Sequence, residues 1–270
     1  MKRDLQAETK VRGFYDNAGW DTDATGSTTD AQLWEDLRPC ASDYIRECRL
    51  KLLDFLPKTG DLFLDAASGP IQYPEYLTYS TGFRKRVCVD ISKKALEQAE
   101  RKLGDRGEYV CVSILDLPFP DNYFDAIVSL HTIYHIDKEQ QEAAVRQLIR
   151  VAKPGAPIVI IYANPDKLLT RLRRLVSRKE PHPEVAEQSA PLYYFAYPLD
   201  WWNKFADAAS IQFSPWRSLT HSDAKRLIPD NSFGTFLHRV VLKAERTFPA
   251  LVTRLGAYPM IVLKKPSAAA

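Results

Sequence analysis

Between residues 61 and 162, short apolar runs alternate with segments whose apolar residues recur at helical spacing. This alternation limits the fold more than any other feature of the chain. The runs are rich in β-branched and aromatic residues and lack polar alternation, which is typical of parallel strands covered on both faces. They are DLFLDA (61–66), RVCVDI (86–91), EYVCVSI (108–114), FDAIVSL (124–130) and APIVIIY (156–162). Strands and helices in alternation predict βαβ units around a parallel sheet.

The flanking segments read mainly as helices. Helical patterns cover 30–56 with a break near Pro39, 165–179 with many basic residues, 200–209, and 233–255 with a break at Pro249, and AYPMIVLKK (257–265) reads as a last strand. We therefore expect a Rossmann-like α/β fold: a seven-stranded, mostly parallel sheet with helices on both faces, plus N-terminal and post-strand-five helical additions. The expected division is a helical cap (1–60), a ligand-binding core (61–164), and a helical lid insertion with C-terminal strands that complete the same sheet (165–270).

The net charge and the cysteine pattern indicate which partners and which cellular compartment to expect. The net charge of +3 argues against a nucleic-acid partner, and there is no signal peptide or apolar run of transmembrane length. Because the four cysteines form no CxxC pair, we expect buried free thiols in a reducing compartment. These features predict a cytoplasmic protein without stable membrane insertion, and they leave the oligomeric state open.

The first predicted strand ends in an acid followed by very small residues. Asp65 precedes Ala66, Ala67, Ser68 and Gly69. In an open parallel sheet, ligands bind outside the carboxyl ends of the strands, and a bare turn there lets a ligand approach backbone N–H groups. Only one glycine remains of the GxGxxG pattern of dinucleotide-binding proteins, which argues against a nicotinamide oxidoreductase.

A second acid, Asp90, ends the next predicted strand. It lies at about the distance along the chain at which a βαβ nucleotide site places a carboxylate on the ribose hydroxyls. A carboxylate can accept both hydroxyl protons. The alternative is that Asp90 caps the following helix together with Ser92, and both roles are compatible.

The motifs together resemble class I S-adenosylmethionine-dependent methyltransferases, with a core similar to the ubiquinone/menaquinone biosynthesis methyltransferases. The likeness covers about residues 60–162 and rests mostly on LPFPDNYFD (117–125) and RVAKPG (150–155). Ala67 and Ile71 stand where the family usually has glycines, and Ser113 stands where it often has an aspartate.

The resemblance implies S-adenosylmethionine as cofactor. Asp65 would orient the turn and the methionine amine, and Ala67 and Gly69 would give backbone contacts. Asp90 would hold the ribose, Ile91 would pack on the adenine, Ser113 and the Ile114 N–H would read the adenine edge, and Leu130 would lie beside the methionine. Ile91 and Ile114 would alternatively be ordinary core residues.

The segment VRGFYDNAGWDTD (11–23) is too polar for a core strand. In related methyltransferases such an N-terminal segment folds over the cofactor, which makes Tyr15, and also Phe14, candidates for a cap. The alternative is surface packing by Phe14 and Trp20. The same two kinds of explanation apply to the aromatic stretch LYYFAYPLDWW (192–202), which could line an acceptor pocket or fill the core.

His131 and Tyr162 end the fourth and fifth predicted strands and are the catalytic candidates. His131 has a reference pKa of about 6.5, which suits a general base near neutral pH, and Tyr162 could hold the acceptor. The alternative is that His131 only shapes the methionine pocket. His131 and His135 have a metal-ligand spacing, but without a nearby glutamate in the pattern we predict no metal.

Two functions follow from these features. The first is methyl transfer from S-adenosylmethionine to a small-molecule acceptor, at O, N or C. The alternative is a non-catalytic S-adenosylmethionine-fold protein that binds a partner through the basic helix 167–179. An RNA methyltransferase is disfavoured by the low net charge and the absence of an RNA-binding module.

Overall fold

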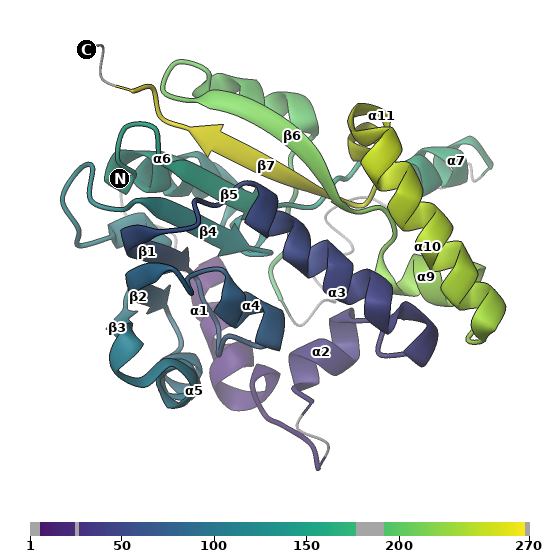
Figure 1. Ribbon diagram of the computed structural model, residues 1–270, viewed down its shortest axis with the longest axis horizontal. Helices are drawn as coiled ribbons and strands as arrows, with labels where there is room; N and C mark the ends of the chain where they lie inside the picture. Colours follow the sequence, from purple (N-terminus) through teal and green to yellow (C-terminus); the bar gives the residue numbers. More distant parts are fainter. Residues whose placement is uncertain (1–5, 25–26, 177–191, 268–270) are drawn as a thin grey trace.

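A computed structural model describes residues 6–24, 27–176 and 192–267. It contains a seven-stranded sheet in the order β3-β2-β1-β4-β5-β7-β6 (Figure 1). The strands are β1 (Gly60–Ala66), β2 (Phe83–Asp90), β3 (Gly107–Cys111), β4 (Ala126–Leu130), β5 (Pro157–Ile161), β6 (Ser210–Arg217) and β7 (Tyr258–Lys264). The pairs among β1 to β5 are parallel, and β7 runs antiparallel to β5 and β6. The predicted Rossmann-like, mostly parallel sheet is confirmed.

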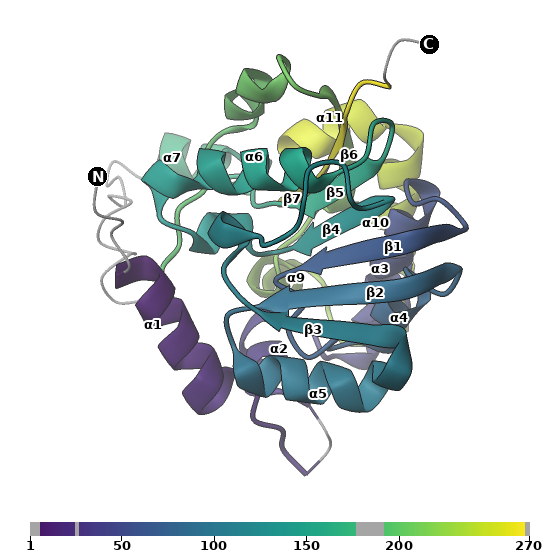
Figure 2. The same cartoon turned by 90° about the vertical axis from the view of Figure 1, so that its left-hand side faces the viewer.

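Helices cover both faces of this sheet (Figure 2). The α-helices are α1 (Gln6–Phe14), α2 (Thr29–Trp34), α3 (Ser42–Leu50), α4 (Pro74–Thr78), α5 (Lys93–Leu103), α6 (Gln141–Val151), α7 (Leu168–Val176), α9 (His221–Leu227), α10 (Ser232–Thr247) and α11 (Pro249–Leu255). Short helical turns include η1 (Tyr15–Gly19) and η8 (Leu199–Phe205). One face packs on α3 through Tyr44 and Cys48, and the other packs on α6 and η8 through Leu148 and Trp202.

The C-terminal segment joins the sheet as expected, but one of its strands has no clear sequence signal. β6 contains Pro215 in the segment SIQFSPWR, which is not a continuous apolar run. β6 is an edge strand, and proline is tolerated at an edge because one side of the strand needs no ladder hydrogen bonds. The ladder between β6 and β7 is irregular between Pro215 and Arg217.

The cysteines differ from expectation at one position. Cys40, Cys48 and Cys88 are buried free thiols, whereas Cys111 is exposed, so the prediction that all four are buried is wrong. The reason is that β3 is the other edge of the sheet, and the Cys111 side of it is open to solvent. Of the predicted basic helix, Arg178 and Lys179 lie outside the described residues, as does the proline-containing stretch before Leu192.

Candidate active site

A cavity of about 990 Å³ lies at the carboxyl ends of the parallel strands. Its walls come from the turn after β1, the ends of β2 and β4, the N-terminal segment, and residues that follow β5. Ten of the eleven predicted site residues line it: Tyr15, Asp65, Ala67, Gly69, Asp90, Ile91, Ser113, Ile114, Leu130 and His131. Residues that are 116 positions apart in the chain therefore meet in one space.

The turn after β1 has the backbone shape that glycine favours. Ala67, Gly69 and Ile71 have φ angles of 59°, 53° and 50°. The two non-glycine residues at expected glycine positions thus keep a left-handed conformation, which is uncommon for residues with side chains and rare for a β-branched one. The Trp20 ring packs closely over the centre of the turn, since a Cβ on Gly69 would lie 3.2 Å from it.

The two strand-ending acids are held in different ways. Asp65 forms a buried ion pair with Arg86. Asp90 is buried without an ion pair among the described residues and accepts hydrogen bonds from the Gly69 and Ser92 N–H groups, each at 2.9 Å. Burial outweighs these bonds and raises the pKa of Asp90 to about 6. Ser92 itself caps α5, so Asp90 lines the cavity and also stabilises the strand-to-helix turn.

The N-terminal segment lies over the turn. Tyr15 stacks on Trp20 with 4.5 Å between ring centroids, and Trp20 covers Gly69. Four bonds hold the segment on α5. Asp16 accepts from the Ser92 hydroxyl at 2.6 Å, and its carbonyl accepts from Lys94 at 3.4 Å. Lys94 also pairs with Asp21 at 2.5 Å, and Gln98 donates to the Trp20 carbonyl at 3.1 Å. Tyr15 therefore lines the cavity, while Trp20 packs between the segment and the turn.

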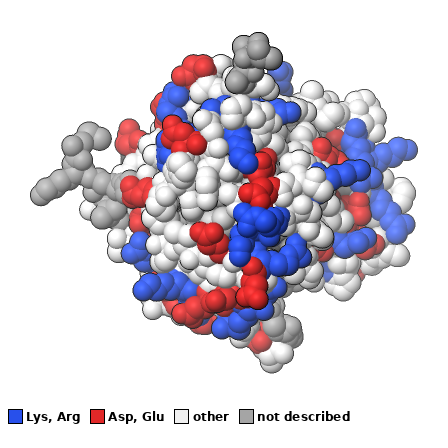
Figure 3. Space-filling model, turned by 60° about the vertical axis from the view of Figure 1, so that its left-hand side comes forward, with Lys and Arg blue, Asp and Glu red and all other residues white. Residues whose placement is uncertain are grey.

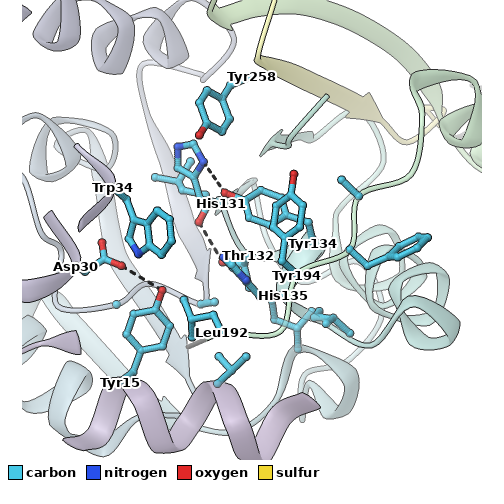
Figure 4. Close-up of a pocket in the computed structure, with 18 of the residues that line it drawn as sticks. Tyr15, Asp30, Trp34, His131, Thr132, Tyr134, His135, Leu192, Tyr194 and Tyr258 are labelled. Carbon is cyan, nitrogen blue, oxygen red and sulfur yellow. Dashed lines mark hydrogen bonds between the residues drawn. The ribbon is translucent and has the colours of Figure 1, made fainter. Parts of the chain in front are cut away.

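Asp30 on α2 is a cavity residue that the sequence reasoning missed. Its carboxylate accepts from the Tyr15 hydroxyl at 3.2 Å (Figure 4). It also accepts from the Gln72 amide at 3.3 Å. No lysine or arginine among the described residues forms an ion pair with it, and burial raises its pKa to about 6. Nothing in the local pattern TDAQLW separates such a residue from an ordinary helix-start acid.

His131 lies in the middle of the cavity with a φ of 57°. Its Nδ1 is 2.9 Å from the Tyr134 hydroxyl, and its ring meets Trp216 edge-on with 4.6 Å between centroids. Burial, with the nearby Arg217 charge, lowers the pKa of His131 to about 3. The ring is therefore neutral at physiological pH and is a weak base in this setting, while one of its nitrogens can still accept a hydrogen bond.

The prediction that Tyr162 faces the cleft is wrong. Its side chain is fully buried and does not line the cavity. Its hydroxyl donates to Gln141 at 2.7 Å and accepts from the Tyr197 N–H at 2.9 Å. Neighbouring residues of a strand point to opposite faces, and Tyr162 points into the α6 layer.

The far end of the cavity is aromatic and charged. Glu35 pairs with both Arg49 and Arg217, and all three side chains are buried. Aromatic rings form the surrounding walls: Trp34, Tyr73, Tyr76, Tyr134, Tyr194, Trp216 and Tyr258. The predicted aromatic stretch is divided, because Tyr194 and Phe195 line the cavity whereas Trp202 is fully buried in the core.

The half of the cavity near the turn fits a nucleoside. Asp90 offers a carboxylate for a ribose diol, Ile91 and Ile114 offer apolar contacts for a base, and the small turn residues Ala67 and Ser68 line the same wall. The Ser113 hydroxyl already accepts from the Leu115 N–H at 3.3 Å and has further hydrogen-bonding capacity. This donor set is compatible with S-adenosylmethionine.

Comparisons with known proteins agree with the sequence motifs. Residues 64–160 match the model of a methyltransferase domain family. The ubiquinone/menaquinone biosynthesis C-methyltransferase UbiE of Coxiella burnetii is 30% identical over 162 residues, which are 52% of this chain and 61% of that protein. The UbiE of Chromobacterium violaceum is 34% identical over 117 residues, 38% of this chain and 43% of that one. The chain thus spans less than two thirds of these relatives' length.

Solved structures share the fold at low identity. Geranyl diphosphate C-methyltransferase from Streptomyces coelicolor has a TM-score of 0.59 at 15% identity, with 96% of this chain and 98% of that chain covered. The [4+2]-cyclase SpnF has a TM-score of 0.55 at 17% identity, with 93% and 88% covered. The matched domain, the strand order and the motifs agree: residues 64–160 belong to the methyltransferase domain family and lie within a Rossmann-like sheet.

Proposed function

We propose that the protein transfers a methyl group from S-adenosylmethionine to a small-molecule acceptor. One observation carries this proposal: a single cavity joins the Gly69 turn and Asp90 to the aromatic space beyond His131. A donor and an acceptor can therefore lie next to each other in one enclosed site. Methyl transfer depends mainly on such alignment and on the exclusion of water.

The chain's own residues would divide the task. S-adenosylmethionine, when bound, supplies an electrophilic methyl group on a sulfonium. Asp90, Ile91, Ser113, Ile114 and the Ala67–Gly69 turn would hold its nucleoside, and Tyr15 would cover it. The acceptor's aromatic neighbours would then fix its reacting atom in line with the carbon–sulfur bond that breaks.

The general-base role of His131 is part of the proposal. The pKa of about 3 makes a proton on this ring costly while the cavity is empty, so the role requires an acceptor whose developing positive charge or acidic proton lies against it. His131→Gln is expected to lower turnover about 10²- to 10⁴-fold without changing cofactor affinity by more than a small factor. Full turnover in this variant would contradict the general-base role, and the alignment of donor and acceptor alone would then account for the rate.

A non-catalytic binding role is the alternative. The shared fold of SpnF, a [4+2]-cyclase by name, illustrates that this architecture does not fix one reaction. The described part of α7 gives limited support to a partner helix: Leu168 and Leu172 are exposed, but Lys167 pairs with Asp223 and Thr170 lines the cavity.

The deciding experiment uses S-adenosylmethionine with an isotope-labelled methyl group. The protein is incubated with a small-molecule extract of cells, and products that carry the label are sought by mass spectrometry. Asp90→Ala is the matched control, because at a cofactor concentration near the wild-type Kd it should lower cofactor occupancy strongly while leaving the acceptor half intact. Labelled products with the wild type alone support methyl transfer. Tight binding of S-adenosylhomocysteine with no labelled product from any extract favours the alternative.

A further inference from the structure

The helices α9, α10 and α11 expose an unusual set of large apolar side chains. Their exposed fractions lie between 48% and 59%. We call this set the α10 face: Leu227, Phe233, Phe236, Val240, Phe248 and Leu251. Single exposed apolar residues are normal on a soluble protein, but a stripe of them marks an interaction surface.

The stripe follows from the geometry of α10. Phe233, Phe236 and Val240 are spaced three and four residues apart and so share one side of the helix. Gly234, His238 and Glu245 occupy the opposite side and are buried. The Phe233 and Phe236 rings are stacked with 6.3 Å between centroids. One side of α10 therefore packs on the protein, and the apolar side opposite to it has no partner among the described residues.

Basic residues flank these apolar side chains. Six exposed cations lie on the three helices: Lys225, Arg226, Arg239, Lys243, Arg246 and Arg254. Arg246 pairs with Glu47 at 2.9 Å, and the acids of residues 221–255 do not balance the other five cations. Asp223 and Glu245 are buried in ion pairs with Lys167 and Lys51, which leaves Asp230 as the exposed acid of that segment. Figure 3 shows lysine and arginine side chains over the right-hand part of the surface, with some acidic side chains between them.

We propose that the α10 face docks on the surface of an anionic phospholipid bilayer. Exposed phenyl and aliphatic groups with lysine and arginine beside them suit the boundary between acyl chains and negative headgroups. A nucleic acid would use the cations but would leave the apolar stripe in water. No helix in the described part of the chain is long and apolar enough to span a membrane, so the contact is peripheral.

The same face adjoins the cavity. α9 begins at His221, which lines the cavity and whose ring lies 6.1 Å from that of Trp34 between centroids, and it ends at Leu227. α9 thus links the cavity wall to the α10 face, whose own six residues do not line the cavity. An apolar acceptor that reaches the cavity from the membrane is a corollary, and that corollary alone rests on the proposed methyl transfer.

The test is sedimentation of the full chain with vesicles. We expect binding to vesicles that contain phosphatidylglycerol, little binding to pure phosphatidylcholine, and weaker binding at high salt. Phe233→Ser with Phe236→Ser should weaken binding at least about tenfold. Arg239→Glu and Lys243→Glu should each weaken it by about fivefold or more. Leu53→Ser with Lys58→Glu, exposed positions before β1, is the matched control and should bind as the wild type does.

Circular dichroism of each variant verifies the fold, and analytical ultracentrifugation measures self-association. Absence of wild-type binding to anionic vesicles at low salt overturns the proposal. So does a dimer that the two phenylalanine substitutions dissociate, since the face would then be covered by a second copy. Because none of these measurements uses methyl transfer, the docking can fail while the proposed function stands, and the reverse also holds.

Discussion

Replacement of Glu35 by glutamine should destabilise the fold strongly. Glu35 is the shared counter-ion of two arginines from distant parts of the chain, with Arg49 at 3.0 Å and Arg217 on its other oxygen. Each of the three side chains is at most 9% exposed. In Glu35→Gln, Arg49 keeps its pairing with Glu75, whereas Arg217 loses its ion-pair partner and remains buried.

The magnitude follows from the carboxyl's own titration. The two guanidinium groups overcome burial and lower the pKa of Glu35 from 4.5 to about 2. That difference corresponds to about 3 kcal/mol, and loss of one partner from a buried pair costs about 3–5 kcal/mol. Because the folded-state pKa is the lower one, this stabilisation is complete above the unfolded-state pKa of 4.5. It is lost as the pH falls from there through about 2.

Urea unfolding monitored by circular dichroism at pH 7 measures the change. Glu47→Gln is the control, since its partner Arg246 is exposed and the loss should be below about 1 kcal/mol. The double variant Glu35→Gln with Arg217→Met should recover part of the loss, because the uncompensated cation is removed. A loss below about 1 kcal/mol for Glu35→Gln, equal to that of the control, would refute the reasoning.

Three further outcomes can be measured directly. Asp90→Ala should weaken S-adenosylhomocysteine binding by about 10- to 150-fold in calorimetry, since a charge-assisted hydrogen bond is lost, and unchanged affinity would contradict the ribose assignment. Hydrogen exchange in the first thirty residues should slow when S-adenosylhomocysteine is added, while equal exchange in both states would mean ordinary packing. A maleimide reagent should modify Cys111 rapidly and Cys48 and Cys88 slowly, because burial raises the pKa of each of the latter to about 12. Rapid labelling that persists in Cys111→Ser would contradict the burial pattern.

The central strands were predictable because their signal is local. β4 and β5 are covered on both faces and read as mainly apolar runs, and β1 and β2 have such a run in their buried parts, LFL and VCV. The edge strand β6 carries serine, glutamine and proline and depends on pairing with β7, a partner more than forty residues away. Its place is decided by tertiary contacts that no short window contains.

The candidate site also has a part that the sequence could predict and a part that it could not. The residues proposed to hold the cofactor follow the ends of recognisable strands, so the topology brings them to one edge of the sheet. The Glu35–Arg217 pair joins residues 182 positions apart, and no spacing rule connects them. The prediction for Tyr162 was wrong for a different reason. Its position at the end of a strand was right, but side chains alternate along a strand, and that of Tyr162 points to the α6 face.

Ala67, Ile71 and His131 all hold a left-handed backbone although each carries a side chain. Such a conformation costs about 1–2 kcal/mol per residue, so this end of the protein stores strain comparable to a sizeable part of a domain's net stability. The sheet beneath must be rigid enough to impose it. In return, a ligand at this turn meets a backbone already in shape and loses little freedom of the chain on binding. Selection at these positions therefore trades thermal robustness of the fold for readiness of the site.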